Sequence, residues 1–166
     1  MKLILRKWKR SDVDALAKIA NNKNIADNLR DMFPHPYKKK DAKAWIEMIK
    51  KKKAANSFCI EVDGKVAGSI CFFLKDDVYR KNIELGYFIA EEYWGRGAAT
   101  EAIRQTLQHI KKKFDVVRIY AEVFEHNKAS MKVLEKNGFH LESVRKRSVI
   151  KNDVIMDDYV WVKLLK

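Results

Sequence analysis

The sequence is short of residues that break or cross-link a chain. Its 166 residues include only two cysteines, two prolines and six glycines, and both prolines, Pro34 and Pro36, lie in one segment. It contains no internal repeat, no low-complexity tract and no linker rich in glycine, serine or proline. We therefore expect a single domain over residues 1–166, a length that suits one hydrophobic core.

Long apolar runs are also absent. No stretch approaches the roughly 20 apolar residues that a membrane-spanning helix needs. The segment Met1–Trp8 has one short apolar triplet followed by charge, and it lacks the apolar core and cleavage site of a signal peptide. We therefore expect a cytoplasmic protein without membrane association.

The cysteines and histidines give no sign of a disulfide framework or a metal site. Cys59 and Cys71 lie in two consecutive apolar stretches and could face each other in a sheet. A reducing cytosol would keep them as thiols, and buried apolar filling is the simplest role for them. The histidines are scattered without metal-ligand spacing, so we expect no metal. The four histidines are His35, His109, His126 and His140.

The charge is strongly one-sided. The chain has 35 basic and 22 acidic residues, which gives a net charge of +13 at pH 7. Such an excess favours anionic partners such as a nucleotide, an acidic peptide, RNA or the ribosome. The alternative is a lysine-rich solvated surface without a partner.

The hydrophobic periodicity predicts alternating helices and strands. Ser11 and Asp14 are expected to cap a helix with an apolar face that includes Leu16, and Asp41 begins a second helix. Residues 21–40 are expected to be irregular, and Asp63-Gly64 is a strong hairpin signal. Further helices are expected over 98–114 and 128–137, and strands over 3–8, 57–62, 65–74, 82–89, 117–124, 143–150 and 154–164.

This order predicts an α/β (α+β) fold. The strand, long helix, strand and helix in the second half favour one parallel pairing, whereas the hairpins favour antiparallel strands elsewhere. We expect a mixed, twisted and mostly antiparallel sheet of about seven strands, with helices on both faces.

The most informative segment runs from Tyr87 to Ala102. It reads as a strand, a loop with Gly95 and Gly97, and the start of a helix. Backbone N–H groups at a helix N-terminus can bind a phosphate, and glycines allow close approach of the backbone. The segment is not a P-loop, and Thr100 replaces the third glycine of Gly-x-Gly-x-x-Gly. From the residues alone, a tight strand-to-helix turn remains an equal alternative.

Trp94 to Ala99 resembles the Gln/Arg-x-x-Gly-x-Gly/Ala signature of the GNAT acetyltransferases, although Trp94 departs from its first position. Asn127 to Phe139 resembles the family's Asn-x-x-Ser/Ala … Gly-Phe motif. The string from Tyr93 to Ala102 and the segment Pro34 to Tyr37 are similar to the branch that contains the ribosomal-protein N-terminal acetyltransferases.

The resemblance implies a GNAT-like fold, acetyl-CoA as co-substrate and no metal. It implies that the loop backbone holds the pyrophosphate of coenzyme A, and that Asn127 binds the pantetheine arm or caps the following helix. The loop residues concerned are Gly95, Arg96, Gly97, Ala98, Ala99 and Thr100. A backbone N–H near Phe88 or Ile89, where the family's strand diverges from its neighbour, would stabilise the oxyanion.

Glu84 is the candidate general base. On a strand its side chain points opposite to those of Ile83 and Leu85, beside the phosphate loop, and related enzymes often use a glutamate here, directly or through water. An exposed strand charge or an acceptor-binding group is the alternative. Many members of the family use a tyrosine to protonate the thiolate, but Leu134 stands there. The remaining hydroxyl is that of Ser130, which could hydrogen-bond the sulfur or the pantetheine arm, with helix-surface packing as the alternative.

The acceptor is less well defined by the sequence. We expect it to enter between residues 21–40 and the last hairpin, with Phe33, Tyr37 and Trp45 as lining candidates that would fit a core equally well. The leading hypothesis is direct acetyl transfer in a ternary complex to the α-amine of a peptide or protein, a ribosomal protein among the candidates. The alternatives are a small-molecule acceptor (polyamine, antibiotic or amino acid) and a non-catalytic RNA-binding or ribosome-binding protein. A monomer or a homodimer is expected.

Overall fold

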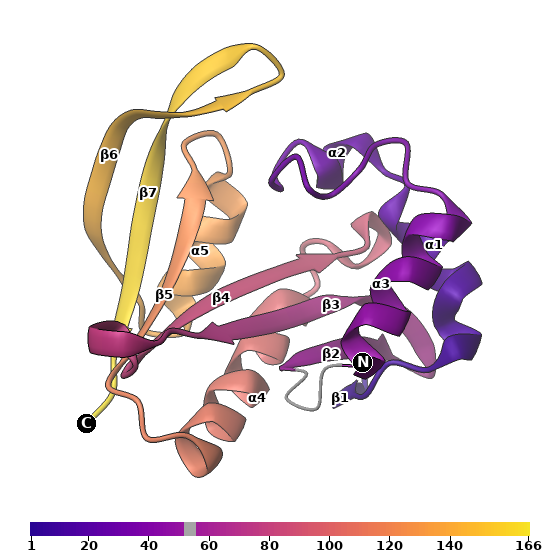
Figure 1. Cartoon of the computed structure of the whole chain (residues 1–166), viewed down its shortest axis with the longest axis horizontal. Coiled ribbons are helices and arrows are strands. Elements are labelled where there is room, and N and C mark those ends of the chain that lie inside the picture. Colours follow the sequence, from indigo (N-terminus) through magenta and orange to yellow (C-terminus); the bar gives the residue numbers. More distant parts are fainter. Residues whose placement is uncertain (52–55) are drawn as a thin grey trace. The chain divides into compact units, whose positions relative to one another are not determined.

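The computed structural model describes residues 1–51 and 56–166, and Figure 1 shows its elements. The chain forms two compact units, each built from two separate stretches of sequence. Unit 1 contains Met1–Cys71 and Tyr87–Ala102, and unit 2 contains Phe72–Gly86 and Ile103–Lys166. The prediction of one domain over 1–166 stays a prediction.

The strands form a seven-stranded sheet in the order β1-β2-β3-β4-β5-β7-β6. β1 with β2, β2 with β3, β5 with β7 and β6 with β7 are antiparallel, whereas β4 and β5 are parallel. The mixed, mostly antiparallel sheet expected from the sequence is therefore confirmed. None of the described helices is both long and apolar enough to cross a membrane.

Unit 1 has a core in which the first helices cover aromatic and aliphatic side chains. The core cluster contains Trp8, Leu16, Tyr37 and Ile46, with Trp45 and Phe33 packed against it. Apolar residues recur once per helical turn, which places them on one buried face. The elements of this part of the chain are β1 (Leu3–Arg6), α1 (Val13–Ala20), α2 (Lys23–Ala26), α3 (Lys39–Lys51), β2 (Ser57–Val62), β3 (Lys65–Leu74), and the 3-10 turns η1 (Arg10–Asp12) and η3 (Glu91–Tyr93).

The N-terminal region differs from the prediction in several places. β1 ends at Arg6, before the predicted Trp8, and α3 begins at Lys39, before the predicted Asp41. Ser11 lies inside η1 and does not cap α1; instead, the Asp12 carboxylate accepts a hydrogen bond from the Lys9 N–H at 2.8 Å. The segment predicted to be irregular contains the short helix α2, which Asn22 caps by accepting from the Asn24 N–H at 2.8 Å. A four-residue helix is too short to show a hydrophobic period, so it escaped detection.

The β2–β3 hairpin forms as predicted. Asp63 and Gly64 connect the strands with φ of 48° and 81°, the two positive values that a tight type I′ turn requires. The sequence suggested that the two cysteines could face each other across this hairpin. They do not lie directly opposite, because Cys59 pairs with Ser69 and Cys71 with Ser57. Neither cysteine is part of a disulfide.

Unit 2 is dominated by a long antiparallel hairpin of β6 and β7, drawn in yellow in Figure 1. β6 begins three residues earlier than predicted, since register shifts after Leu141 and Arg145 interrupt its alternating pattern. The elements are η2 (Asp77–Tyr79), β4 (Asn82–Ile89), α4 (Ala98–Lys113), β5 (Arg118–Phe124), α5 (Lys128–Lys136), β6 (His140–Lys151) and β7 (Val154–Leu164), of which β4 and α4 continue into unit 1.

Candidate active site

The predicted phosphate loop has the geometry that its glycines suggested. Gly95 and Gly97 have φ of 71° and 81°, and a Cβ added at either would meet nothing within 4 Å. α4 begins directly afterwards at Ala98 and runs for 16 residues. Its first amides have no carbonyl one turn earlier to bond, and its dipole makes this end positive. The exposed loop is therefore a suitable site for an anion.

Trp94, the residue that departs from the family signature, has a structural role in this loop. Its indole Nε1–H donates to the carbonyl oxygen of Ile89 at 2.8 Å, and its backbone N–H donates to the carbonyl of Glu91 at 3.0 Å. The first bond joins the start of the loop to the end of β4, and the second joins it to η3. The side chain therefore stabilises the turn from which Gly95 and Gly97 follow.

A second set of contacts joins α2 to the same loop. The Asn22 and Asn24 side-chain amides donate to the two carboxylate oxygens of Glu91, at 2.5 and 3.1 Å. Sequence reasoning did not identify these partners. Nothing in the spacing could reveal them, because the contacts join residues almost 70 positions apart.

The end of β4 lies against a glycine of β3. A Cβ on Gly68 would lie 2.3 Å from the Phe88 carbonyl oxygen, and the Ala90 N–H donates to the Ala67 carbonyl at 2.8 Å. Only glycine permits this approach of two backbones. The predicted oxyanion donors near Phe88 and Ile89 lie on the strand segment that this contact holds, and their role stays a prediction.

Gly68→Ala should therefore destabilise the protein. We expect a loss of roughly 1–3 kcal/mol in the free energy of unfolding, the usual cost of an extra methyl group in a packed interior. Urea denaturation followed by fluorescence measures this loss. Lys65→Ala, at an exposed position of the same strand, is the control and should change the stability by less than about 0.5 kcal/mol. Equal stabilities of the two variants would contradict the close approach at Gly68.

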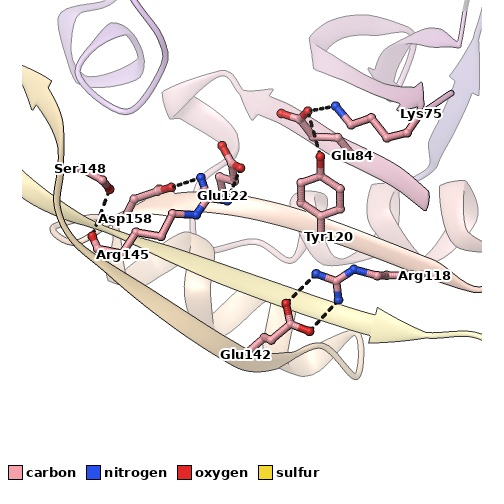
Figure 2. A network of polar contacts seen from close by, with 9 residues as sticks. All are labelled: Lys75, Glu84, Arg118, Tyr120, Glu122, Glu142, Arg145, Ser148 and Asp158. Carbon is pink, nitrogen blue, oxygen red and sulfur yellow. Dashed lines mark hydrogen bonds and ion pairs between the residues drawn. The ribbon is translucent and has the colours of Figure 1, made fainter. Parts of the chain in front are cut away.

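Glu84 projects from β4 as predicted, opposite to the buried side chains of Ile83 and Leu85. Its carboxylate oxygen Oε2 is 2.5 Å from the Lys75 ammonium and 3.5 Å from the Tyr120 hydroxyl (Figure 2). The carboxylate is 14% exposed. The hydrogen bond to Glu84 raises the pKa of Lys75, which keeps this lysine charged.

Lys75 and Tyr120 were not identified from the sequence. Tyr120 reaches Glu84 because β4 and β5 are parallel with Glu84 opposite Tyr120. The sequence favoured a parallel pairing, but it did not fix the register that brings these residues together.

Asn127 and Ser130 lie at the start of α5. The Asn127 side chain accepts from the Ser130 backbone N–H at 3.2 Å, so it caps the helix. Ser130 is half-buried, and Leu134 is fully buried where the family pattern would have a tyrosine. The structure thus shows Asn127 as a helix cap, which was one of its two predicted roles. A contact of Asn127 with pantetheine and a role of Ser130 at the thiolate stay predictions.

The predicted acceptor-lining residues belong to the core region of unit 1. Tyr37 is buried, and burial raises the pKa of its hydroxyl to about 12. Trp45 packs edge-on against Trp8, with ring centroids 5.2 Å apart. Phe33 is half-buried, and its ring centroid lies 4.9 Å from that of Tyr37 and 5.5 Å from that of Phe88. Phe33 therefore touches a residue of the predicted cofactor region.

Other chemistries receive no support from the described residues. Burial raises the pKa of the Cys59 thiol to about 12, so it is not a thiolate at neutral pH. Within residues 1–51 and 56–166, no group of three or more histidine, cysteine, aspartate or glutamate side chains could hold a metal ion.

Known proteins with similar sequences are acetyltransferases. A sequence model described as "Acetyltransferase (GNAT) domain" matches residues 2–140. The probable N-acetyltransferase YjcK of Bacillus subtilis (strain 168) is 33% identical over 98 residues, 59% of this chain and 54% of YjcK. The chain thus spans about half the length of that relative. The L-amino acid N-acetyltransferase AaaT of Escherichia coli (strain K12) is 22% identical over 163 residues, 98% of each chain.

A solved structure confirms the fold. The ribosomal L7/L12 alpha-N-protein acetyltransferase RimL, in complex with coenzyme A, has a TM-score of 0.88 and 20% sequence identity to this chain. The similarity covers 99% of this chain and 95% of that one. At this identity the similarity concerns the fold alone.

Proposed function

Since the chain belongs to the acetyltransferase (GNAT) family, we propose that it transfers an acetyl group from acetyl-CoA to a primary amine, the α-amine of a peptide or protein. The observation that carries the proposal is the loop at residues 95–100. Two glycines with positive φ and the N-terminus of a 16-residue helix meet there. Backbone amides in this arrangement bind phosphate oxygens without needing a lysine, which suits the pyrophosphate of coenzyme A.

The proposed reaction is a direct transfer between the two bound substrates. The acceptor nitrogen attacks the thioester carbonyl, the C–N bond forms, and the C–S bond breaks after a tetrahedral intermediate. Backbone N–H groups near Phe88 or Ile89 would stabilise the oxyanion of that intermediate. Glu84 would accept the amine proton, directly or through water. Ser130 would donate a hydrogen bond to the thiolate, which takes its proton from solvent. The neutral state of the Cys59 thiol supports direct transfer over an acyl-cysteine route.

Three measurements test this function. Isothermal titration calorimetry with acetyl-CoA tests binding, and thiol release over a panel of amines tests transfer. Filter binding of RNA over a salt series tests the alternative of a non-catalytic RNA-binding protein, which the charge of +13 permits. Salt-sensitive RNA binding together with no affinity for acetyl-CoA would favour that alternative.

A small-molecule acceptor is the second candidate. The full-length similarity to AaaT, an L-amino acid N-acetyltransferase, favours it, whereas the similarity to RimL, an alpha-N-protein acetyltransferase, favours a protein acceptor. Among small molecules, polyamines fit least well. Two of the acidic groups that could attract them already have basic partners: Asp157 binds Lys146 at 2.8 Å, and Asp158 lies 3.5 Å from Arg145.

Peptides that begin with serine or alanine should therefore be better substrates than spermidine. We expect a ratio of about ten or more in kcat/KM, the low end of what electrostatic steering provides, because spermidine must approach a chain of net charge +13. The measurement compares both acceptors at low and moderate salt, and the ratio should shrink as salt screens the repulsion. A preference for spermidine would refute the peptide acceptor and leave the acetyl transfer standing.

A further inference from the structure

We propose that Lys75 and Tyr120 are positioning residues, which hold Glu84 in one orientation and keep its carboxylate ionised during acetyl transfer. This inference rests on the proposed function, in which Glu84 receives the proton of the acceptor amine. It concerns two residues that no sequence motif identified. All three side chains belong to unit 2: Lys75 directly follows β3, Glu84 lies on β4 and Tyr120 lies on β5.

The contacts converge on one oxygen atom. The Lys75 ammonium lies 2.5 Å and the Tyr120 hydroxyl 3.5 Å from Oε2 of Glu84. Lys75 is also 5.6 Å from the centroid of the Tyr120 ring. The three groups therefore form a closed triangle, in which a rotation of the Glu84 side chain would break two contacts at once.

A second cation, Arg118, lies near the ring of Tyr120. The Arg118 guanidinium lies 5.6 Å from the same ring centroid, and it donates to both carboxylate oxygens of Glu142, at 2.7 and 2.5 Å. A bidentate pair of this kind fixes the guanidinium plane. The tyrosine ring thus lies between two cations, each bound to a carboxylate (Figure 2).

The charged groups near Glu84 favour its ionised form. Lys75, directly after β3, and Tyr120 from β5 contact it, and Arg118 lies 5.6 Å from the centroid of the tyrosine ring. The next polar group on the same face of β5, Glu122, is bound to Arg145 at 2.5 Å, and Arg145 is also 3.5 Å from Asp158. An opposite charge in contact with a carboxyl group favours the carboxylate. Arg145 is therefore the counter-ion of Glu122 and Asp158, the negative charges farther along this face.

This arrangement defines how Glu84 would act. A carboxylate that stays ionised through the neutral range is a constant acceptor for the amine or a bridging water, and its charge stabilises the cationic nitrogen of the tetrahedral intermediate. Loss of the Lys75 charge should raise the pKa of Glu84. At low pH the variant would then lose its acceptor, whereas at high pH Glu84 would still work.

The experiment measures kcat from pH 5.5 to 9 with acetyl-CoA and a peptide with N-terminal serine. In Lys75→Met the acid limb of the profile should move upward by roughly 1–3 pH units, the usual effect of one adjacent opposite charge, while kcat above pH 8 is retained. Lys75→Arg keeps the charge and should keep the wild-type profile. Tyr120→Phe, which removes the hydroxyl but keeps the ring, should lower kcat with little change in KM.

Lys81→Met is the matched control, because it removes a lysine from the ion pair with Asp115 just before β4. Its profile should equal that of the wild type. A second readout needs no acceptor: carbon NMR of the labelled Glu84 carboxyl, assigned by its loss in Glu84→Gln, should show the same upward movement in Lys75→Met alone.

The outcomes separate this inference from the proposed function. If Glu84→Gln is impaired but the Lys75→Met profile and the NMR titration match the wild type, Lys75 has no influence on Glu84 and the inference is overturned. If Lys75→Met loses activity equally at every pH, the lysine is only structural, which also overturns it. If Glu84→Gln retains full turnover, the proton role of Glu84 fails and the inference fails with it.

Discussion

Gly97→Glu is expected to reduce the affinity for acetyl-CoA by about 100-fold or more, which corresponds to at least ~2.7 kcal/mol of binding free energy. The open space around the position of a Cβ at Gly97 is where an anion would approach the loop amides. A glutamate side chain would fill that space and add a negative charge against the pyrophosphate. Calorimetry with acetyl-CoA on the folded variant measures the loss.

Gly64→Glu provides an unusually close control. Gly64 has the same φ of 81° as Gly97 and the same absence of neighbours within 4 Å, but it lies in the β2–β3 turn. Both variants therefore carry the same backbone strain, on the order of 1–2 kcal/mol. Only Gly97→Glu should lose affinity for acetyl-CoA. Wild-type affinity in a folded Gly97→Glu variant would remove the loop from the cofactor site.

The elements that the sequence predicted well are those with local signals. β2, β3, β4 and β7 have the predicted bounds, because period-2 alternation and turn residues such as Asp63-Gly64 specify a strand without reference to distant residues. α4 was found from its repeating apolar face, in which Ile103, Leu107 and Ile110 are buried. The loop with Gly95 and Gly97 was found for the same reason, since both glycines lie within three residues, and its phosphate role stays a prediction.

The features that escaped prediction depend on contacts between distant residues. The link from Asn22 and Asn24 to Glu91 and the ion pair of Lys75 with Glu84 require the strand order and register, which a single sequence does not specify. Trp94 is an intermediate case. Sequence comparison marked it as a departure from the signature, but only the structure shows that its indole bonds the Ile89 carbonyl.

The contacts of Glu84 with Lys75 and Tyr120 also predict which properties the Glu84→Gln substitution should change. Glutamine has nearly the same shape as glutamate and can still bond Lys75 and Tyr120, so the fold and the acetyl-CoA affinity should barely change. What it lacks is the charge and the ability to take a proton. Glu84→Gln should therefore affect turnover far more than binding.

We expect Glu84→Gln to lower kcat by roughly 10²–10⁴-fold, the usual contribution of a positioned general acid or base. Steady-state thiol release with a serine peptide measures kcat, and calorimetry verifies that acetyl-CoA still binds. Glu61→Gln is the matched control: Glu61 is 19% exposed against 14% for Glu84, and it too has a basic partner at 2.5 Å, Arg6. Since Glu61 lies on β2 of unit 1, its variant should lose some stability but keep its turnover. Similar kcat values for both variants would mean that Glu84 supports the fold or binds the acceptor, and that the amine loses its proton directly to solvent.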